Sequence, residues 1–190
     1  MEPRPLGLND LTDEARNRLT RQSYAARSPI AGVELSEVAV WRSADGLFAE
    51  LARIDGGGGS VQGLEGFRPI QWNWSLLQPG AVKAWHLHLD QDDLFIVPPT
   101  STLLVGLADL RRDAHPGTRP TPQSLVLGAG RCHRLLIPRG VGHGVANLGT
   151  EPQGLIYAVT KFFTADADRN DEWRLPWDHF GADFWSMARG

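Results

Sequence analysis

The chain has 190 residues and a formal net charge of -3 at pH 7, so its size suits one domain with a sizeable core. The charge gives no reason to expect a general affinity for nucleic acid or acidic membranes, and no segment approaches the ~20 apolar residues of a membrane-spanning helix. The N-terminal residues lack the basic-then-apolar layout of a secretory signal. The lone Cys132 has no partner for an internal disulfide, which predicts a cytoplasmic protein.

Residues 1–30 are predicted to form an N-terminal arm, and residues 31–190 the folded domain. Within the arm, residues 9–21 are expected to form a short helix, because Leu11, Ala15 and Leu19 recur at a spacing of four. So short a helix is marginally stable alone, and it is therefore expected to pack on the domain or on a partner subunit.

The rest of the chain consists mainly of short apolar runs separated by Gly and Pro clusters, which predict strands. The expected strands are 33–41, 47–54, 69–75, 82–88, 94–97, 102–110, 124–127, 134–137, 142–147 and 154–162. Many short strands with regular turn signals indicate an all-β sandwich or barrel. The tail, residues 170–185, is rich in Trp, Asp and Phe and is expected to fold over one end of the barrel.

Two polar motifs lie on these strands. The first runs from Gly80 through His86-Leu87-His88 to Asp93, and the second from Pro138-Arg139-Gly140 through His143 to Asn147. Alternate residues of a strand share a face, so His86 and His88 can both point into a barrel, and His143 can reach the same interior from another strand. Together the motifs resemble those of the cupin superfamily, an antiparallel jelly-roll β-barrel. The resemblance implies a polar pocket lined by His86 and His143.

Cupins include metal-dependent enzymes and metal-free ones. Here His86, His88, Asp93 and His143 could bind a divalent metal, since imidazole and carboxylate groups are common ligands. Metal cupins usually carry Glu in the first motif, where this chain has Asp92 or Asp93, which have a shorter reach. A metal-dependent oxygenase or isomerase is therefore an alternative function.

A longer resemblance covers residues 45 to 185. It rests on the segments 45–50, 70–75, 84–86, 108–111, 137–144, 155–157, 162–163 and 177–185, of which Pro-x-Gly-x-x-His-Gly and Asp-Leu-Arg are the most telling. In these segments the chain is similar to the dTDP-4-dehydrorhamnose 3,5-epimerase family, a metal-free branch of the cupins.

This resemblance implies an enzyme that epimerises a dTDP-4-keto-6-deoxyhexose without a cofactor and works as a homodimer. The chemistry needs a base for the proton alpha to the ketone, stabilisation of the enolate, and an acid on the other face. By resemblance His86 is the base, Tyr157 is the proton donor, and His143 contacts the sugar or its developing oxyanion. The implied contacts to the nucleotide and its diphosphate are Glu50, Gln71, Asn73 and Lys83.

The chain also departs from the family. A family arginine is replaced by Asp45, and Asp93 occupies the position of a lysine that helps to stabilise the enolate. The family's aspartate that orients the base has Asp178 as its counterpart here. A carboxylate close to His86 is expected to raise the pKa of this histidine and to fix its tautomer. A non-catalytic barrel that binds sugar nucleotides is a further alternative.

Overall fold

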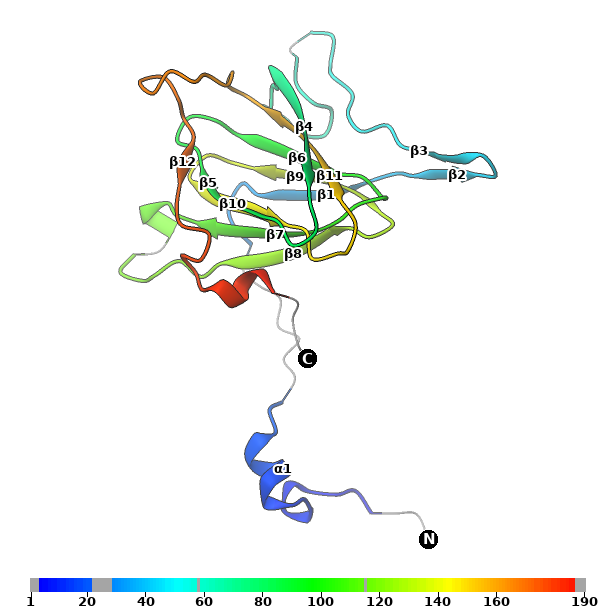
Figure 1. Ribbon diagram of the computed structural model, residues 1–190, viewed down its shortest axis with the longest axis vertical. Coiled ribbons are helices and arrows are strands. Elements are labelled where there is room, and N and C mark those ends of the chain that lie inside the picture. The colour runs from blue at the N-terminus through cyan, green and yellow to red at the C-terminus, as the bar shows by residue number, and fades with distance from the viewer. Residues whose placement is uncertain (1–3, 22–28, 58, 115, 187–190) are drawn as a thin grey trace.

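A computed structural model describes residues 4–21, 29–57, 59–114 and 116–186. The described chain is nearly all β-structure, as predicted (Figure 1). Its one α-helix is α1 (Asp13–Arg18), and short 3-10 turns span Leu8–Asp10, Arg112–Ala114 and Ala182–Trp185. The strands are β1 (Glu34–Val38), β2 (Trp41–Ser43), β3 (Gly46–Phe48), β4 (Gln71–Leu77), β5 (Val82–Leu87), β6 (Asp93–Val97), β7 (Thr102–Asp109), β8 (Gln123–Gly128), β9 (Cys132–Ile137), β10 (Val141–Ala146), β11 (Gln153–Val159) and β12 (Trp173–Arg174). Among the described residues, no helix has the length and apolar character needed to cross a membrane.

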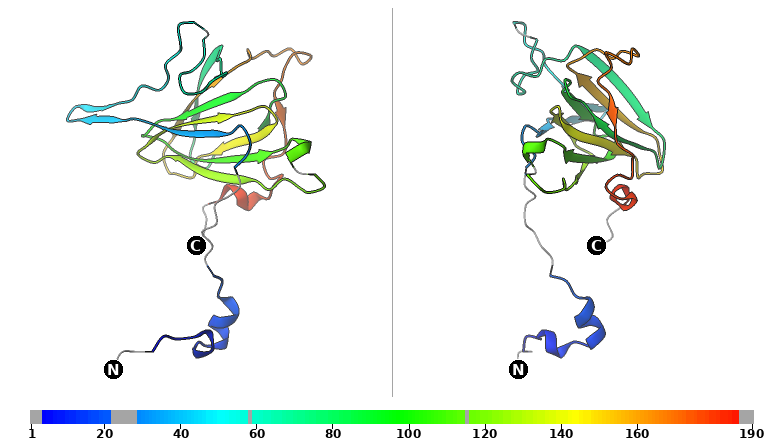
Figure 2. Two further views of the ribbon diagram at one scale, coloured as in Figure 1. Left: turned by 180° about the vertical axis from the view of Figure 1, so that it is seen from behind. Right: turned by 90° about the vertical axis from the view of Figure 1, so that its left-hand side faces the viewer.

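Two five-stranded antiparallel sheets face each other and form the barrel (Figure 2). The first has the order β1-β9-β6-β11-β4 and the second the order β12-β5-β10-β7-β8. Strand β6 shows why these residues suit a central strand. Phe95 and Val97 join the core that side chains of both sheets share, whereas Leu94 and Ile96 join a second cluster with residues of the 49–67 segment. Because successive side chains of a strand point to opposite faces, a continuous apolar run fits a strand covered on both sides.

The C-terminal tail covers the outer face of the second sheet. Trp85 and Trp185 are buried there, and the indole N–H groups of both donate to the Trp177 carbonyl, at 3.1 and 2.8 Å. A side chain at Gly106 would lie 2.6 Å from the Trp185 ring, so this close packing requires glycine. Upstream of this contact, β12 pairs with β5 in a register that sets Arg174 opposite His86. The tail therefore reaches the candidate site.

Three expected elements differ from the structure. The strand expected over 33–41 is divided into β1 and β2, which belong to different sheets. The strand expected over 47–54 is only three residues long, and β3 pairs with β2 in a hairpin that extends away from the barrel (Figure 1). Helix α1 is shorter than residues 9–21, because Thr12 caps it by accepting from the Ala15 N–H at 3.3 Å and the chain is extended again at Leu19. None of the residues of α1 is buried, so the expected packing of this helix on the barrel is not observed. The division into an arm over 1–30 and a domain over 31–190 stays a prediction.

Candidate active site

A cavity of about 560 Å³ lies between the two sheets. Gln71, Asn73 and Ser75 line it from β4, while their neighbours Trp72 and Trp74 point outwards and are exposed. This alternation is the period of a strand with one face towards the cavity. Further lining side chains come from β5, β6, β10, β11 and the tail, and they include Lys83, His86, Asp93, His143, Tyr157, Glu172 and Arg174. The structure thus gathers most of the predicted site residues around one polar cavity.

His86 is held by a carboxylate from the tail. Its Nδ1 lies 3.2 Å from Oε1 of Glu172, and Nε of Arg174 donates to the same oxygen at 3.1 Å. A carboxylate at this distance favours the neutral tautomer whose proton is on Nδ1 and whose lone pair is on Nε2. This arrangement resembles the base and its orienting acid in general acid–base catalysis.

The carboxylate that orients His86 is Glu172, and the expectation of Asp178 is wrong. Asp178 is exposed and follows Trp177, whose carbonyl is bound on the outer face of the second sheet. Glu172 directly precedes β12, which pairs with β5, so its side chain reaches the histidine. No periodic signal in the sequence pointed to Glu172, because β12 is only two residues long.

Burial sets the protonation of the candidate base and acid. Burial lowers the pKa of His86 to about 4, and the charges of His143 and Arg174 act in the same direction. Together these effects outweigh the charge of Glu172, which raises the pKa. A nearby carboxylate acts in the predicted direction on the pKa of His86, but the net pKa is lowered because desolvation of the imidazolium is the larger effect. Burial also raises the pKa of Tyr157, as do the negative charges of Asp93 and Glu172. At neutral pH the histidine is unprotonated and the phenol keeps its proton.

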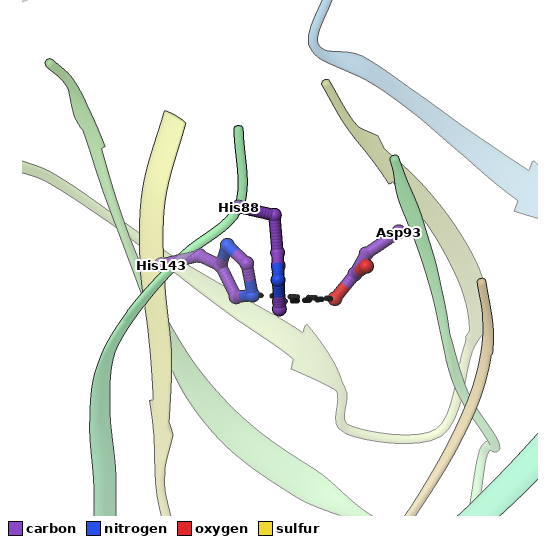
Figure 3. A group of neighbouring side chains, drawn as sticks. All are labelled: His88, Asp93 and His143. Carbon is purple, nitrogen blue, oxygen red and sulfur yellow. Dashed lines mark ion pairs between the residues drawn. The ribbon is translucent and has the colours of Figure 1, made fainter. Parts of the chain in front are cut away.

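Deeper in the cavity, His88, Asp93 and His143 form a buried cluster (Figure 3). Oδ2 of Asp93 lies 3.3 Å from Nε2 of His143 and 3.7 Å from Nε2 of His88. The ring of His86 is 6.0 Å from that of His143, nearly parallel to it, and the ligand atoms of His86 do not belong to the cluster. The structure therefore brings together three of the four residues predicted as metal ligands, and His86 is the one left out.

The two acids considered for that set have different roles. Asp92 pairs with Arg139 through Oδ2 at 2.9 Å, so its carboxylate is directed away from the cluster. Asp93 is 4% exposed and points into the cavity. Burial favours a higher pKa for Asp93, but the hydrogen bond and charge of His143 and the charge of His88 outweigh it, so the pKa is lowered.

The predicted nucleotide contacts divide into two groups. Gln71, Asn73 and Lys83 line the cavity; Gln71 donates to Asn73 at 2.8 Å, and Nζ of Lys83 donates to Ser75 at 2.7 Å. Glu50 lies outside the lining, where it is exposed and pairs with Arg53 at 2.8 Å. Lys161 and Arg174 also line the cavity. No motif in the sequence pointed to these two cations, because only long-range contacts bring them there.

Comparisons with known proteins show what the chain is similar to. A search of protein-family models finds none that matches the chain. The spore coat polysaccharide biosynthesis protein SpsL of Bacillus subtilis is 38% identical over 149 residues, which cover 78% of this chain and 91% of the relative. The probable low-salt glycan biosynthesis epimerase Agl13 of Haloferax volcanii is 33% identical over 105 residues, 55% of this chain and 65% of the relative. A solved structure of dTDP-4-dehydrorhamnose 3,5-epimerase from Bacillus anthracis, with TDP and PPi bound, has a TM-score of 0.66 and 23% identity, covering 86% of this chain and 90% of that one.

A barrel of two facing antiparallel sheets whose cavity is lined by a histidine, a carboxylate and a tyrosine has the cupin-like fold. The chain belongs to the dTDP-4-dehydrorhamnose 3,5-epimerase family and is a divergent member of it. By their names, SpsL is a protein of polysaccharide biosynthesis and Agl13 a probable epimerase of glycan biosynthesis. The chain falls in the general class of sugar epimerases and isomerases.

Proposed function

We propose that the protein epimerises a dTDP-4-keto-6-deoxyhexose at C3, at C5 or at both carbons. The supporting observation is the pairing of a neutral histidine and a protonated tyrosine across one cavity. His86 is on β5 of the second sheet and Tyr157 is on β11 of the first, and both line the cavity. Epimerisation needs a base on one face of the sugar and an acid on the other, and two facing sheets supply these positions.

In the proposed reaction, Nε2 of His86 removes the proton alpha to the C4 ketone and the electron pair moves to the ketone oxygen. Glu172 stabilises the imidazolium that forms, as the acid of a catalytic triad does. The Tyr157 hydroxyl then protonates the same carbon from the opposite face, which inverts it. These proton transfers require no organic cofactor and no redox step.

His143 has a supporting role in this proposal. Its Nδ1 lies 3.1 Å from the Val141 carbonyl and its Nε2 faces Asp93, so both nitrogens already have protein partners. Its nearly parallel ring backs that of His86 at 6.0 Å between centroids. We therefore propose that His143 positions His86 and forms part of the cavity surface beneath the oxyanion that develops on the substrate.

The polar and cationic residues around the cavity are suited to the nucleotide. We assign Lys83 to the diphosphate, with Lys161 and Arg174 as additional positive charges, because lysine and arginine are the usual partners of phosphate oxygens. Gln71 and Asn73 offer amide groups to the sugar or base. Glu50 is exposed outside the cavity, so it reaches a nucleotide only if the nucleotide extends from the cavity or belongs to a second subunit.

Deuterium exchange tests the proposed reaction directly. Incubation with a dTDP-4-keto-6-deoxyhexose in D2O should introduce deuterium at C3 or C5, because each proton removed by His86 is replaced from solvent. Proton NMR of the recovered sugar nucleotide gives the position and the rate. Calorimetric binding of the nucleotide without exchange at either carbon, at high enzyme concentration, would instead indicate a non-catalytic sugar-nucleotide-binding barrel and reject the proposal.

We also propose that the protein is a homodimer. Strand β4 lies at the edge of the first sheet, and Trp72 and Trp74 on its outer face are 44% and 67% exposed. Trp41 and Phe48 are exposed on the β2–β3 hairpin. Exposed apolar patches of this kind mark contact surfaces. Sedimentation equilibrium should give twice the 20.9 kDa of one chain, and Trp74→Lys should weaken association; a wild-type monomer at micromolar concentration contradicts the proposal.

A further inference from the structure

The cluster of His88, Asp93 and His143 has the dimensions of a metal site. The three ligand atoms lie within 4.8 Å of one another, and Figure 3 shows them pointing towards a common centre. Bonds of about 2.0–2.1 Å to a tetrahedral zinc ion place two ligand atoms ~3.3 Å apart. The distances from Asp93 Oδ2 to the two Nε2 atoms, 3.3 and 3.7 Å, are close to this separation.

Both histidines are held in the tautomer that a metal requires. Nδ1 of His88 lies 2.7 Å from the Asp171 carbonyl oxygen, and Nδ1 of His143 lies 3.1 Å from the Val141 carbonyl oxygen. A carbonyl oxygen only accepts hydrogen bonds, so each Nδ1 carries a proton and Nε2 is the nitrogen left to face Asp93 or a cation. Metal-binding histidines are commonly oriented by such a bond from the other ring nitrogen.

A buried carboxylate faces two imidazoles in this cluster. Asp93 is 4% exposed, and its Oδ2 faces Nε2 of both histidines. Within the described part of the chain, no Lys or Arg is among the hydrogen-bonding or ion-pairing partners of Asp93. A carboxylate this buried requires a positive charge close by, supplied either by a proton on a facing imidazole or by a cation among the three ligand atoms.

Gln91 is the remaining polar neighbour. Its amide nitrogen donates to Oδ1 of Asp93 at 2.7 Å and lies 3.3 Å from Nε2 of His88. A bound cation would take over the His88 lone pair, while the bond to Oδ1 would keep the carboxylate oriented with Oδ2 towards the centre. The amide thus has the position of an outer partner of a ligating carboxylate.

We propose that His88, Asp93 and His143 bind one divalent transition-metal cation at the floor of the cavity. Two imidazoles and one carboxylate favour Zn²⁺, Fe²⁺, Mn²⁺, Co²⁺ or Ni²⁺ over Mg²⁺ and Ca²⁺, which prefer oxygen ligands. All three residues line the cavity, so the open coordination positions face the substrate space. The cation would supply positive charge where the family's lysine is replaced by Asp93; this role, unlike the binding itself, rests on the proposed function.

Titration of the chelator-dialysed full-length protein with Zn²⁺ and with Co²⁺ tests the site. Calorimetry should give one ion per chain with a Kd below about 1 µM, and Co²⁺ should show the absorption of a site with nitrogen and oxygen ligands. Asp93→Asn and His88→Gln should each weaken binding by ~100-fold or more, because each removes one of three ligands. Asp93→Glu retains a carboxylate and should retain binding. His179→Gln changes an exposed histidine outside the cavity and should bind as the wild type does.

Circular dichroism checks that each variant is folded, and His88→Gln keeps the test decisive if Asp93→Asn is not folded. Absence of binding by the wild type at about 100 µM of either ion, or undiminished binding by a folded Asp93→Asn, overturns the proposal. Deuterium exchange separates this outcome from the proposed function. Exchange without metal binding rejects the metal site alone, whereas metal binding without exchange rejects the epimerase proposal alone.

Discussion

Replacement of His86 by Asn will reduce deuterium exchange at C3 and C5 by about 10³-fold or more, which is the contribution expected of a general base. His86 combines a lone pair on Nε2, a low pKa and access to the cavity, since 22% of its side chain is exposed. Asn retains a polar side chain of similar reach but cannot accept the proton. The rate of exchange, measured by NMR under saturating substrate, checks the prediction, and circular dichroism checks the fold.

The acid limb of the pH–rate profile of the wild-type enzyme gives an independent readout of His86. A base works only while unprotonated, so kcat/KM falls as pH drops through its pKa in the free enzyme. Since burial lowers the pKa of His86 to about 4, activity should remain level from neutral pH to about pH 5 and decline tenfold per pH unit below about pH 4. A decline in kcat/KM centred near the ordinary pKa of histidine would contradict the assignment of His86 as the base. Deuterium exchange by His86→Asn at the wild-type rate would contradict it as well.

The barrel was predictable because its signals are local. Strands β5 and β10 carry the two histidine motifs, and the turns Gln78-Pro79-Gly80 and Pro138-Arg139-Gly140 precede them in the sequence. Period-two alternation indicated that His86 and His88 share a face, and pairing of β5 with β10 sets His143 opposite His86. A strand motif therefore predicts which side chains face the barrel interior, although it does not predict their hydrogen-bonding partners.

The partners of the site histidines depend on contacts between distant segments. Glu172 reaches His86 only because β12 pairs with β5, and β12 is two residues long, too short for a periodic signal. The Asp171 side chain accepts from the Leu89 and Asp90 N–H groups, at 3.1 and 2.7 Å, and so fixes the start of the tail against the first histidine motif. The sequence likewise could not decide between Asp92 and Asp93, since Arg139, which pairs with Asp92, is 47 residues away.

Glu172→Gln will lower the rate of deuterium exchange by roughly 10²–10⁴-fold, approaching the effect of losing the base itself. The amide of Gln can donate to Nδ1 of His86, and this favours the tautomer whose proton is on Nε2. A histidine in that tautomer cannot accept the substrate proton, and the variant also lacks the negative charge that stabilises the imidazolium. Glu172→Asp keeps the charge with a shorter reach and should lie between the wild type and the Gln variant in exchange rate.

Asp178→Asn is the matched control, because sequence comparison pointed to Asp178 as the orienting acid whereas its side chain is exposed. This variant should exchange deuterium at the wild-type rate. The charge of Glu172 raises the pKa of His86, so any residual activity of Glu172→Gln should have its acid limb at a pH no higher than that of the wild type. A large loss of exchange in Asp178→Asn, together with near-normal exchange in Glu172→Gln, would mean that the tail orients the base through Asp178 during catalysis and that the Glu172 contact is not the functional one.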